Sequence, residues 1–290
     1  MIIVKLIGGL GNQMFQYTAA RQLSYDNNTK LKLDITGFND YKLRTYNLHH
    51  FNILEDFASD KEIAQFTSNG SLKYRILNSI DRFRVYYKRK HVIEQHYHYD
   101  ENMKKVYNSA YLDGYWQSEK YFKDIENIIR KEFTIKTEAN VLNKTMIEKI
   151  KNSNSVSIHI RRGDYVSNQV TSQVIGFLGF EYYFKAIDQI SQSLENPNFF
   201  IFSDDLCWVK ENLKIKYPMT FVDHNNAETN YEDLRLMSLC KHNIIANSSF
   251  SWWGAWLNEN PNKIVFAPNN WFKIDKYNIV SLLPENWIKI

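Results

Sequence analysis

The chain begins with an apolar run, a glycine turn and a helical pattern. Residues 2–7 are almost entirely apolar, which is typical of a buried strand. Three glycines within residues 8–11 follow, then a helical pattern over residues 12–26 and a second apolar run at 31–34. The pattern predicts a strand, a tight turn that uses the conformational freedom of glycine, a helix and a strand.

From about residue 155 onward, short apolar runs alternate regularly with helical patterns. The predicted strands cover residues 156–160, 199–202, 220–222, 243–246 and 263–267. The predicted helices cover residues 180–193, 206–214, 231–241 and 251–258, and two earlier ones cover 119–133 and 138–151. Strands that alternate with helices indicate an α/β protein with a parallel, doubly wound sheet. In such sheets ligands bind at the carboxyl ends of the strands.

The two patterns indicate two domains. We place the boundary near residue 150, with an N-terminal α/β domain over 1–150 and a Rossmann-like domain over 151–290. Residues 36–115 are irregular and rich in tyrosine and histidine, so we expect insertions of the first domain there. A length of 290 residues fits two domains of ordinary size.

Composition excludes several classes. Hydrophobic residues make up 44% and charged residues 23%, as in soluble globular proteins. A net charge of +4 is too balanced for a dedicated nucleic-acid binder. Cys207 and Cys240 cannot build a disulfide framework, and no spacing suggests zinc. With no apolar run long enough for a membrane helix and no signal segment, we expect a cytoplasmic protein.

Residues 73–90 carry seven basic residues and one acid, interleaved with aromatic residues. This stretch predicts weak peripheral contact with an anionic membrane surface, which for a cytoplasmic protein is the inner membrane. The alternative is a solvated helix. The basic residues Arg82, Arg84, Lys88 and Arg89 distinguish the two, because charge reversal there would abolish membrane contact.

The glycine turn stands where a dinucleotide-binding fingerprint would stand. Gly9 and Gly11 match its first two glycines, and Asp34 lies near the position of its acidic residue. Met14, however, replaces the third glycine, which such sites need for close packing of helix and strand. NAD binding is therefore only an alternative. Asn12 and Gln13 at a helix N-terminus instead suggest recognition of sugar hydroxyls or anions.

A cluster of charged residues follows the strand at 156–160. His159 precedes two adjacent arginines, Arg161 and Arg162, and Asp164 comes next. Guanidinium groups bind phosphate oxygens in pairs and stay charged, so we expect a diphosphate ligand here. The alternative is a surface ion pair with Asp164.

Two further polar clusters follow predicted strands. Asp204 and Asp205 come after the strand at 199–202. The strand at 243–246 is followed by Asn247, Ser248, Ser249, Phe250 and Ser251. Hydroxyl and backbone N–H groups there can hold phosphate oxygens, although both clusters could equally cap helices. Of the tryptophans that follow, we expect only Trp253 near a ligand. Because no Asp-x-Asp motif occurs, we expect arginine rather than a metal to bind the diphosphate.

Three segments together resemble the α-1,2-fucosyltransferases of glycosyltransferase family 11. They are residues 8–16, 159–165 and 247–257, in the family's order and spanning nearly the whole chain. The resemblance implies a GT-B fold, with two Rossmann-like domains facing across a cleft and GDP-fucose bound by the C-terminal one. It implies transfer of fucose from GDP-β-L-fucose to the 2-hydroxyl of a terminal galactose, with inversion and without a metal. Lacking an N-terminal membrane anchor, the chain resembles the bacterial members; whether the glycan is O-antigen, capsule or another stays open.

The resemblance also implies roles for individual residues. Arg161 would contact the pyrophosphate, with His159 beside the nucleotide and the segment 248–251 on phosphate oxygens. Asp233 would read guanine, whose two adjacent N–H donors suit a carboxylate; a solvated helix acid is the alternative. Asn12 would approach the fucose or the acceptor, and the irregular region 36–115 would shape the acceptor site.

In the mechanism that the resemblance implies, a base removes the proton of the acceptor hydroxyl. Asp164 is the best-placed candidate, and Glu181 is a weaker one. Asp164 could instead orient one of the arginines. A protein that binds nucleotide sugars or glycans without catalysis is the other reading of the same residues.

Overall fold

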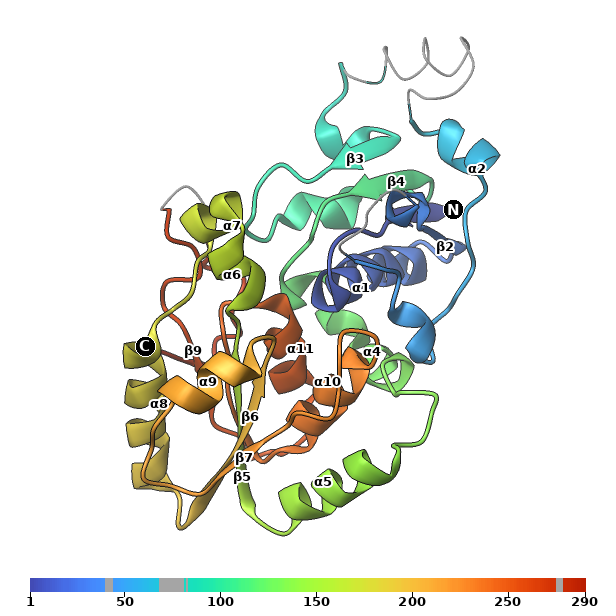
Figure 1. The fold of residues 1–290 in the computed structure, drawn as a ribbon. Helices are drawn as coiled ribbons and strands as arrows, with labels where there is room; N and C mark the ends of the chain where they lie inside the picture. The colour runs from blue at the N-terminus through green and yellow to red at the C-terminus, as the bar shows by residue number, and fades with distance from the viewer. Residues whose placement is uncertain (40–43, 68–80, 82, 275–278) are drawn as a thin grey trace. The chain divides into compact units, whose positions relative to one another are not determined.

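The computed structural model describes residues 1–39, 44–67, 81, 83–274 and 279–290 (Figure 1). The chain forms two compact units. The first comprises Met1–Lys136 and the short segment Asn278–Leu282, and the second comprises Thr137–Tyr277 and Leu283–Ile290. The division falls before the expected boundary near residue 150. The reason is that helix α5 (Val141–Lys151) packs against α10 and β5 of the second unit.

The first unit holds a four-stranded parallel sheet in the order β2-β1-β4-β3. Its strands are β1 (Ile2–Lys5), β2 (Leu31–Asp34), β3 (His91–Ile93) and β4 (Ala110–Asp113). The first two agree with the sequence prediction. The other two lie in the region that we expected to be irregular, because strands of three or four residues leave little periodicity. The strand order reverses direction between β1 and β4, which makes that pair the switch point of this sheet.

Helices of the first unit are mostly short. Helix α1 (Leu10–Asp26) packs against β1 and β2 and is buried along most of its length. The predicted helix over 119–133 is instead broken into three pieces, the last of which is α4. In the described part of this unit, the other helices are α2 (Asp60–Ala64), α4 (Glu126–Glu132) and 3-10 turns at Thr36–Phe38, Leu48–His50, Tyr86–Lys88, Glu101–Lys105, Glu119–Tyr121 and Lys123–Ile125.

The second unit holds a six-stranded parallel sheet in the order β10-β9-β8-β5-β6-β7. Counted in chain order this is 3-2-1-4-5-6 read from the other edge, the order of the doubly wound nucleotide-binding fold. Its strands are β5 (Asn154–Ile160), β6 (Pro197–Ser203), β7 (Met219–Phe221), β8 (His242–Ile244), β9 (Val265–Ala267) and β10 (Ile288–Lys289). All five predicted strands are present, and only the two-residue β10 is new. The switch point lies between β5 and β8.

The helices of the second unit follow the predicted alternation. They are α5, α6 (Gly163–Ser167), α7 (Gln169–Val174), α8 (Phe180–Ser193), α9 (Leu206–Asn212), α10 (Asn230–Leu239) and α11 (Ser249–Leu257). The short α6 and α7 were not predicted, because they contain too few turns to show a helical period.

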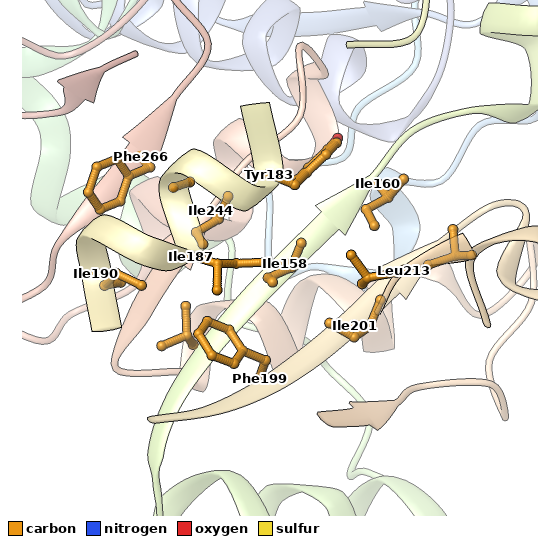
Figure 2. Packing of buried hydrophobic residues seen from close by; sticks show 13 residues of the cluster. Ile158, Ile160, Tyr183, Ile187, Ile190, Phe199, Ile201, Leu213, Ile244 and Phe266 are labelled. Atoms are coloured by element: carbon orange, nitrogen blue, oxygen red, sulfur yellow. The ribbon is translucent and has the colours of Figure 1, made fainter. Parts of the chain in front are cut away.

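The core of the second unit explains why β5 is fixed in place. Figure 2 shows Ile158 and Ile160 of β5 packed with side chains of β6 and α8. Tyr183, Ile187 and Ile190 recur at helical spacing along one face of α8, all of them buried. Because β5 is central and its apolar side chains are buried, the polar residues that follow it start from a rigid base.

Surface features complete the picture. No helix in the described part of the chain is both long and apolar enough to cross a membrane. Both cysteines are free, with Cys207 exposed and Cys240 buried. Residues 73–80 and Arg82 of the basic stretch lie outside the described residues. In the part that is described, Phe83 is 94% exposed, and membrane contact through this stretch stays a prediction.

Truncation of Ile158 to alanine should destabilise the protein by about 2–5 kcal/mol, because it leaves a cavity in a core that is otherwise filled. Val141→Ala on the exposed side of α5 is the matched control and should stay within about 0.5 kcal/mol of the wild type. Urea unfolding of the three proteins measures both values. Equal stabilities would contradict this account of the core.

Candidate functional site

Polar loops gather at the carboxyl edge of the second sheet. The loops after β5, β6 and β8 carry the clusters that the sequence indicated, and parallel strands place their carboxyl ends at one edge. Since β5 and β8 are neighbours, the loops that begin at Arg161 and Asn247 flank the switch point. The fold therefore brings the arginine cluster and the serine segment to the place where such sheets bind nucleotides.

Two carboxylates hold the Arg161 guanidinium. Its Nη2 lies 2.6 Å from Oδ1 of Asp164, and its Nη1 lies 3.1 Å from Oδ2 of Asp204. The arginine side chain is 19% exposed and that of Asp164 is 42% exposed, so the ion pair with Asp164 that the sequence left as an alternative is present. Burying a guanidinium requires such partners. Arg161 is thus held rigidly at the switch point.

Arg162 has a different environment. Its guanidinium forms an ion pair with Asp205 and lies 4.1 Å above the ring of Trp208. Trp208 in turn stacks on Phe180, with ring centroids 5.1 Å apart. These contacts tie the arginine to α8 and α9 and give it a packing role, while phosphate contact by Arg162 stays a prediction.

Both aspartates after β6 serve the arginine loop. Asp204 also accepts a hydrogen bond from the backbone N–H of Arg162, at 2.9 Å. A Cβ at Gly163 would lie 2.4 Å from Oδ2 of Asp204, so only glycine permits this approach. Asp205 accepts from the backbone N–H of Trp208 and caps α9, as the sequence allowed. Both aspartates therefore position arginines and need not contact a ligand themselves.

His159 lies buried beside this cluster. The side chain is 4% exposed, and its ring centroid lies 5.6 Å from that of Phe250. Burial, reinforced by the positive charge of Arg161, lowers the pKa of His159 to about 4 although Asp204 opposes the shift. The imidazole is neutral at pH 7, and its Nδ1 has no hydrogen-bond partner among the described residues. A neutral imidazole can contact a nucleotide but does not supply protons there.

The segment after β8 contains buried residues, Ser248 among them, and two partly exposed ones, Ser249 and Phe250. Asn247 donates to the carbonyl oxygens of Gly176 and Trp271, at 3.1 and 3.2 Å, and so ties three loops together. Ser251 accepts from the backbone N–H of Ala246 and is buried. These two residues hold the loop. Ser248, Ser249 and Phe250 stand at the start of α11, and the Ser248 side chain makes no capping hydrogen bond.

Trp253 is wrongly placed by the sequence prediction. It is fully buried, and its ring lies 5.0 Å from that of Trp252 and 5.2 Å from that of Trp256, measured between centroids. The spacing of the three tryptophans along α11 reflects the core of the unit. Glu181, the weaker candidate base, is exposed in the first turn of α8.

Asp233 in the first turn of α10 belongs to a polar network that the sequence did not reveal. Asn225 donates to its Oδ1 at 2.7 Å, and Asn225 and Asn143 exchange hydrogen bonds. Burial raises the pKa of Asp233 to about 7, opposed by the hydrogen bond from Asn225 and assisted by the charge of Glu232. Asn225 follows β7, and a polar residue at a strand end was the only available signal.

At the switch point of the first unit, the glycine turn and the amides take separate roles. Gly8 has φ +79°, a backbone conformation that favours glycine, so the turn needs glycine at this position. Gly9 begins α1 with extended backbone, whereas Gly11 is buried within the helix. Gln13 is fully buried and uses both ends of its amide on the backbone of Gly8, Thr45 and Asn47. The expectation that Gln13 contacts a substrate was therefore wrong. Asn12 is the partly exposed amide of the turn.

The carboxylate of Asp34 is also occupied. Tyr111 donates to it at 2.6 Å, and Thr36 donates from its hydroxyl and its backbone N–H. Asp34 is 2% exposed, and the side chain therefore fixes a loop instead of reading a ribose. Together with Met14, this removes the basis of the NAD alternative.

Two α/β units, each with a parallel sheet, have the architecture of a GT-B glycosyltransferase. The profile of the family described as "Glycosyl transferase family 11" matches residues 1–290, so the chain belongs to this family. It is 36% identical to the Alpha-1,2-colitosyltransferase of Escherichia coli, covering 100% of this chain and 99% of the relative.

A second relative has a similar sequence, and a solved structure has a similar fold. The chain is 38% identical to the O-antigen biosynthesis glycosyltransferase WbnK of Escherichia coli, covering 98% of this chain and 99% of the relative. The α-1,6-fucosyltransferase NodZ of Bradyrhizobium, solved after soaking with GDP-fucose, superposes with a TM-score of 0.54. At 15% identity, covering 91% of this chain and 94% of that one, this likeness confirms the predicted GT-B fold alone.

The raised pKa of Asp233 makes stability depend on pH. A carboxyl group whose pKa is about 7 in the folded protein and about 3.9 when unfolded binds its proton more tightly when folded. Stability from this group is full below pH 4 and is lost as the pH rises to 7. Asp233→Asn should therefore be more stable than wild type at pH 8 and close to it at pH 4. Urea unfolding at both pH values measures this, and an unchanged difference would contradict it.

Proposed function

We propose that the protein transfers L-fucose from GDP-β-L-fucose to the 2-hydroxyl of a terminal galactose, inverting the anomeric centre to an α-linkage. The observation that carries this proposal is the Arg161 guanidinium, 19% exposed and fixed by Asp164 and Asp204 at the switch point of the second sheet. A rigid guanidinium beside a helix N-terminus suits a diphosphate leaving group. The chain is also 28% identical to human Galactoside alpha-(1,2)-fucosyltransferase 1, over a segment that covers 50% of this chain and 42% of the human protein.

The chemistry follows from where charge develops. As the bond between C1 of the sugar and the β-phosphate oxygen breaks, its electron pair moves to the phosphate and the sugar gains oxocarbenium character. Arg161 and the N–H groups at the start of α11 stabilise the growing negative charge. The 2-hydroxyl oxygen of galactose bonds to C1 from the opposite face and loses its proton.

Asp164 has two parts in this proposal. Its Oδ1 fixes Arg161, as the 2.6 Å contact shows, and its carboxylate is the candidate acceptor for the proton of the galactose hydroxyl. Asp233 reads the guanine edge, with Asn225 orienting its carboxylate. Ser248 and Ser249 complete the phosphate site.

A second donor is favoured by a specific observation. A relative with 36% identity over the whole chain is named for colitose, which is fucose without its 3-hydroxyl. GDP-colitose is therefore the alternative donor. The O-antigen relative supports a galactose-terminated O-antigen glycan as acceptor.

Purified protein, incubated with GDP-fucose or GDP-colitose and a panel of galactosides, tests the function. We expect a product with an α-1,2 linkage, identified by NMR, together with release of GDP. Arg161→Ala should reduce turnover by about 100-fold to 1000-fold, because it removes a preorganised charge from the leaving group. Arg130→Ala, which removes an ion pair on α4, is the matched control and should remain active.

The same assay separates the alternatives. GDP binding without transfer to any galactoside would leave a binding protein and reject the enzyme. Faster turnover of GDP-colitose than of GDP-fucose would identify colitose as the transferred sugar. A fully active Arg161→Ala would reject the assigned phosphate site.

Metal independence is a separate proposal, because it follows from arginine holding the diphosphate. Turnover in millimolar EDTA should match turnover in buffer with added Mn²⁺. A loss of activity in EDTA that Mn²⁺ restores would show that a cation, and not Arg161, carries the charge of the leaving group.

A further inference from the structure

A hydrogen bond in the first unit joins two residues that are far apart in the sequence. Gln117, in the loop after β4, donates from Nε2 to Oδ1 of Asn12 at 2.8 Å. Gln117 is 5% exposed, whereas Asn12 is partly exposed at the start of α1. Because β1 and β4 flank the switch point, their two loops meet where this sheet would bind a ligand.

The direction of this hydrogen bond fixes the polarity of Asn12. An amide has an acceptor at one end and two donors at the other. With Oδ1 turned to Gln117, the Nδ2 end lies on the side of Gly8, where a Cβ would come within 2.8 Å of Nδ2. The positive φ of Gly8 and its missing side chain leave room for that end.

The loop that carries Gln117 is itself held tightly. Glu94 accepts hydrogen bonds from the backbone N–H groups of Tyr115 and Trp116, at 2.7 and 3.0 Å. Trp116 is buried with φ +55°, a strained conformation for a bulky residue that persists only where its surroundings impose it. A Cβ at Gly114 would lie 2.4 Å from Cβ of Glu94, so glycine is needed for this close approach.

A second side-chain amide, that of Gln16, connects the same two loops. Gln16 on α1 accepts from the N–H of Ile7 at 3.0 Å and donates to the carbonyl oxygen of Gly114 at 3.2 Å. The loop after β1 and the loop after β4 are thus connected twice, once through Gln16 and once through the hydrogen bond between Asn12 and Gln117. These contacts fix the backbone directly before Gln117.

We propose that Gln117 is a positioning residue that makes Asn12 present an N–H donor, and not a carbonyl oxygen, to an oxygen atom of the sugar or acceptor. This inference rests on the proposed function, in which Asn12 approaches those groups. Glu94 acts one step further out, because it sets the loop from which Gln117 reaches Asn12. Of Asn12, Gln117 and Glu94, only Asn12 contacts the substrate in this proposal.

Two nearly isosteric substitutions test the polarity. Gln117→Met removes the hydrogen bond and lets the Asn12 amide rotate; turnover should fall about 10-fold. Gln117→Glu replaces the donor by a carboxylate that attracts Nδ2 of Asn12, so the amide turns its oxygen to the substrate. Turnover should then fall about 100-fold, since the substrate oxygen faces an acceptor instead of a donor.

The controls separate positioning from folding. Gln95→Glu introduces the same charge at an exposed neighbour of Glu94 and should leave turnover unchanged. GDP affinity should be similar in both Gln117 variants and the wild type, because the proposed GDP-binding residues belong to the second unit. The melting temperature of Gln117→Met should be close to that of the wild type. Equal losses of stability and GDP affinity would mean a structural role and would overturn the proposal. So would Gln117→Glu turnover at or above that of Gln117→Met.

Failure of the proposed function gives a different result. A wild-type protein that transfers neither sugar rejects the function, and the Asn12 side-chain amide signal in NMR then decides the positioning separately. We expect that signal to move in Gln117→Met relative to wild type. An unmoved signal would overturn the inference.

Discussion

The second unit depends on one cation that is largely withdrawn from water. Arg161 directly follows β5, is 19% exposed and is held by carboxylates from two different loops. A guanidinium in such a place needs partners, so the loops after β5 and β6 must adopt positions that satisfy it. Gly163 is a consequence, since any side chain there would displace Asp204. The apolar packing of β5 shown in Figure 2 supplies the rigid base from which these contacts start.

The neighbouring arginine shows that residue type alone does not decide a role. Arg161 and Arg162 are adjacent in sequence and both pair with aspartates. Successive residues at a strand end diverge, so one guanidinium stands at the switch point and the other stacks on Trp208. Their side chains are similarly exposed, at 19% and 24%, so their positions and partners, and not burial, separate the two guanidinium groups. The same division separates Asn12, which is partly exposed, from Gln13, whose amide is entirely used by the backbone.

The two switch points differ in chemistry. In the second unit the loops carry arginine, aspartate and serine, which suit a charged diphosphate. In the first unit they carry the neutral amides Asn12, Gln16 and Gln117, whose hydrogen bonds run from loop to loop. Neutral amides with fixed polarity suit sugar hydroxyls, which both donate and accept. A transferase that moves a sugar from a diphosphate to a hydroxyl needs one surface of each kind.

The sequence by itself determined five of the six strands of the second sheet, the glycine turn and the location of the arginine cluster, because apolar periodicity and strand-end polarity are local properties. Tertiary structure alone decided that Trp253 is core, that Gln13 is structural and that Asn225 orients Asp233. It also decided that Gln117 faces Asn12. These roles depend on partners brought together by strand order and burial, and a hydrogen bond between distant loops leaves no periodic signal in either one.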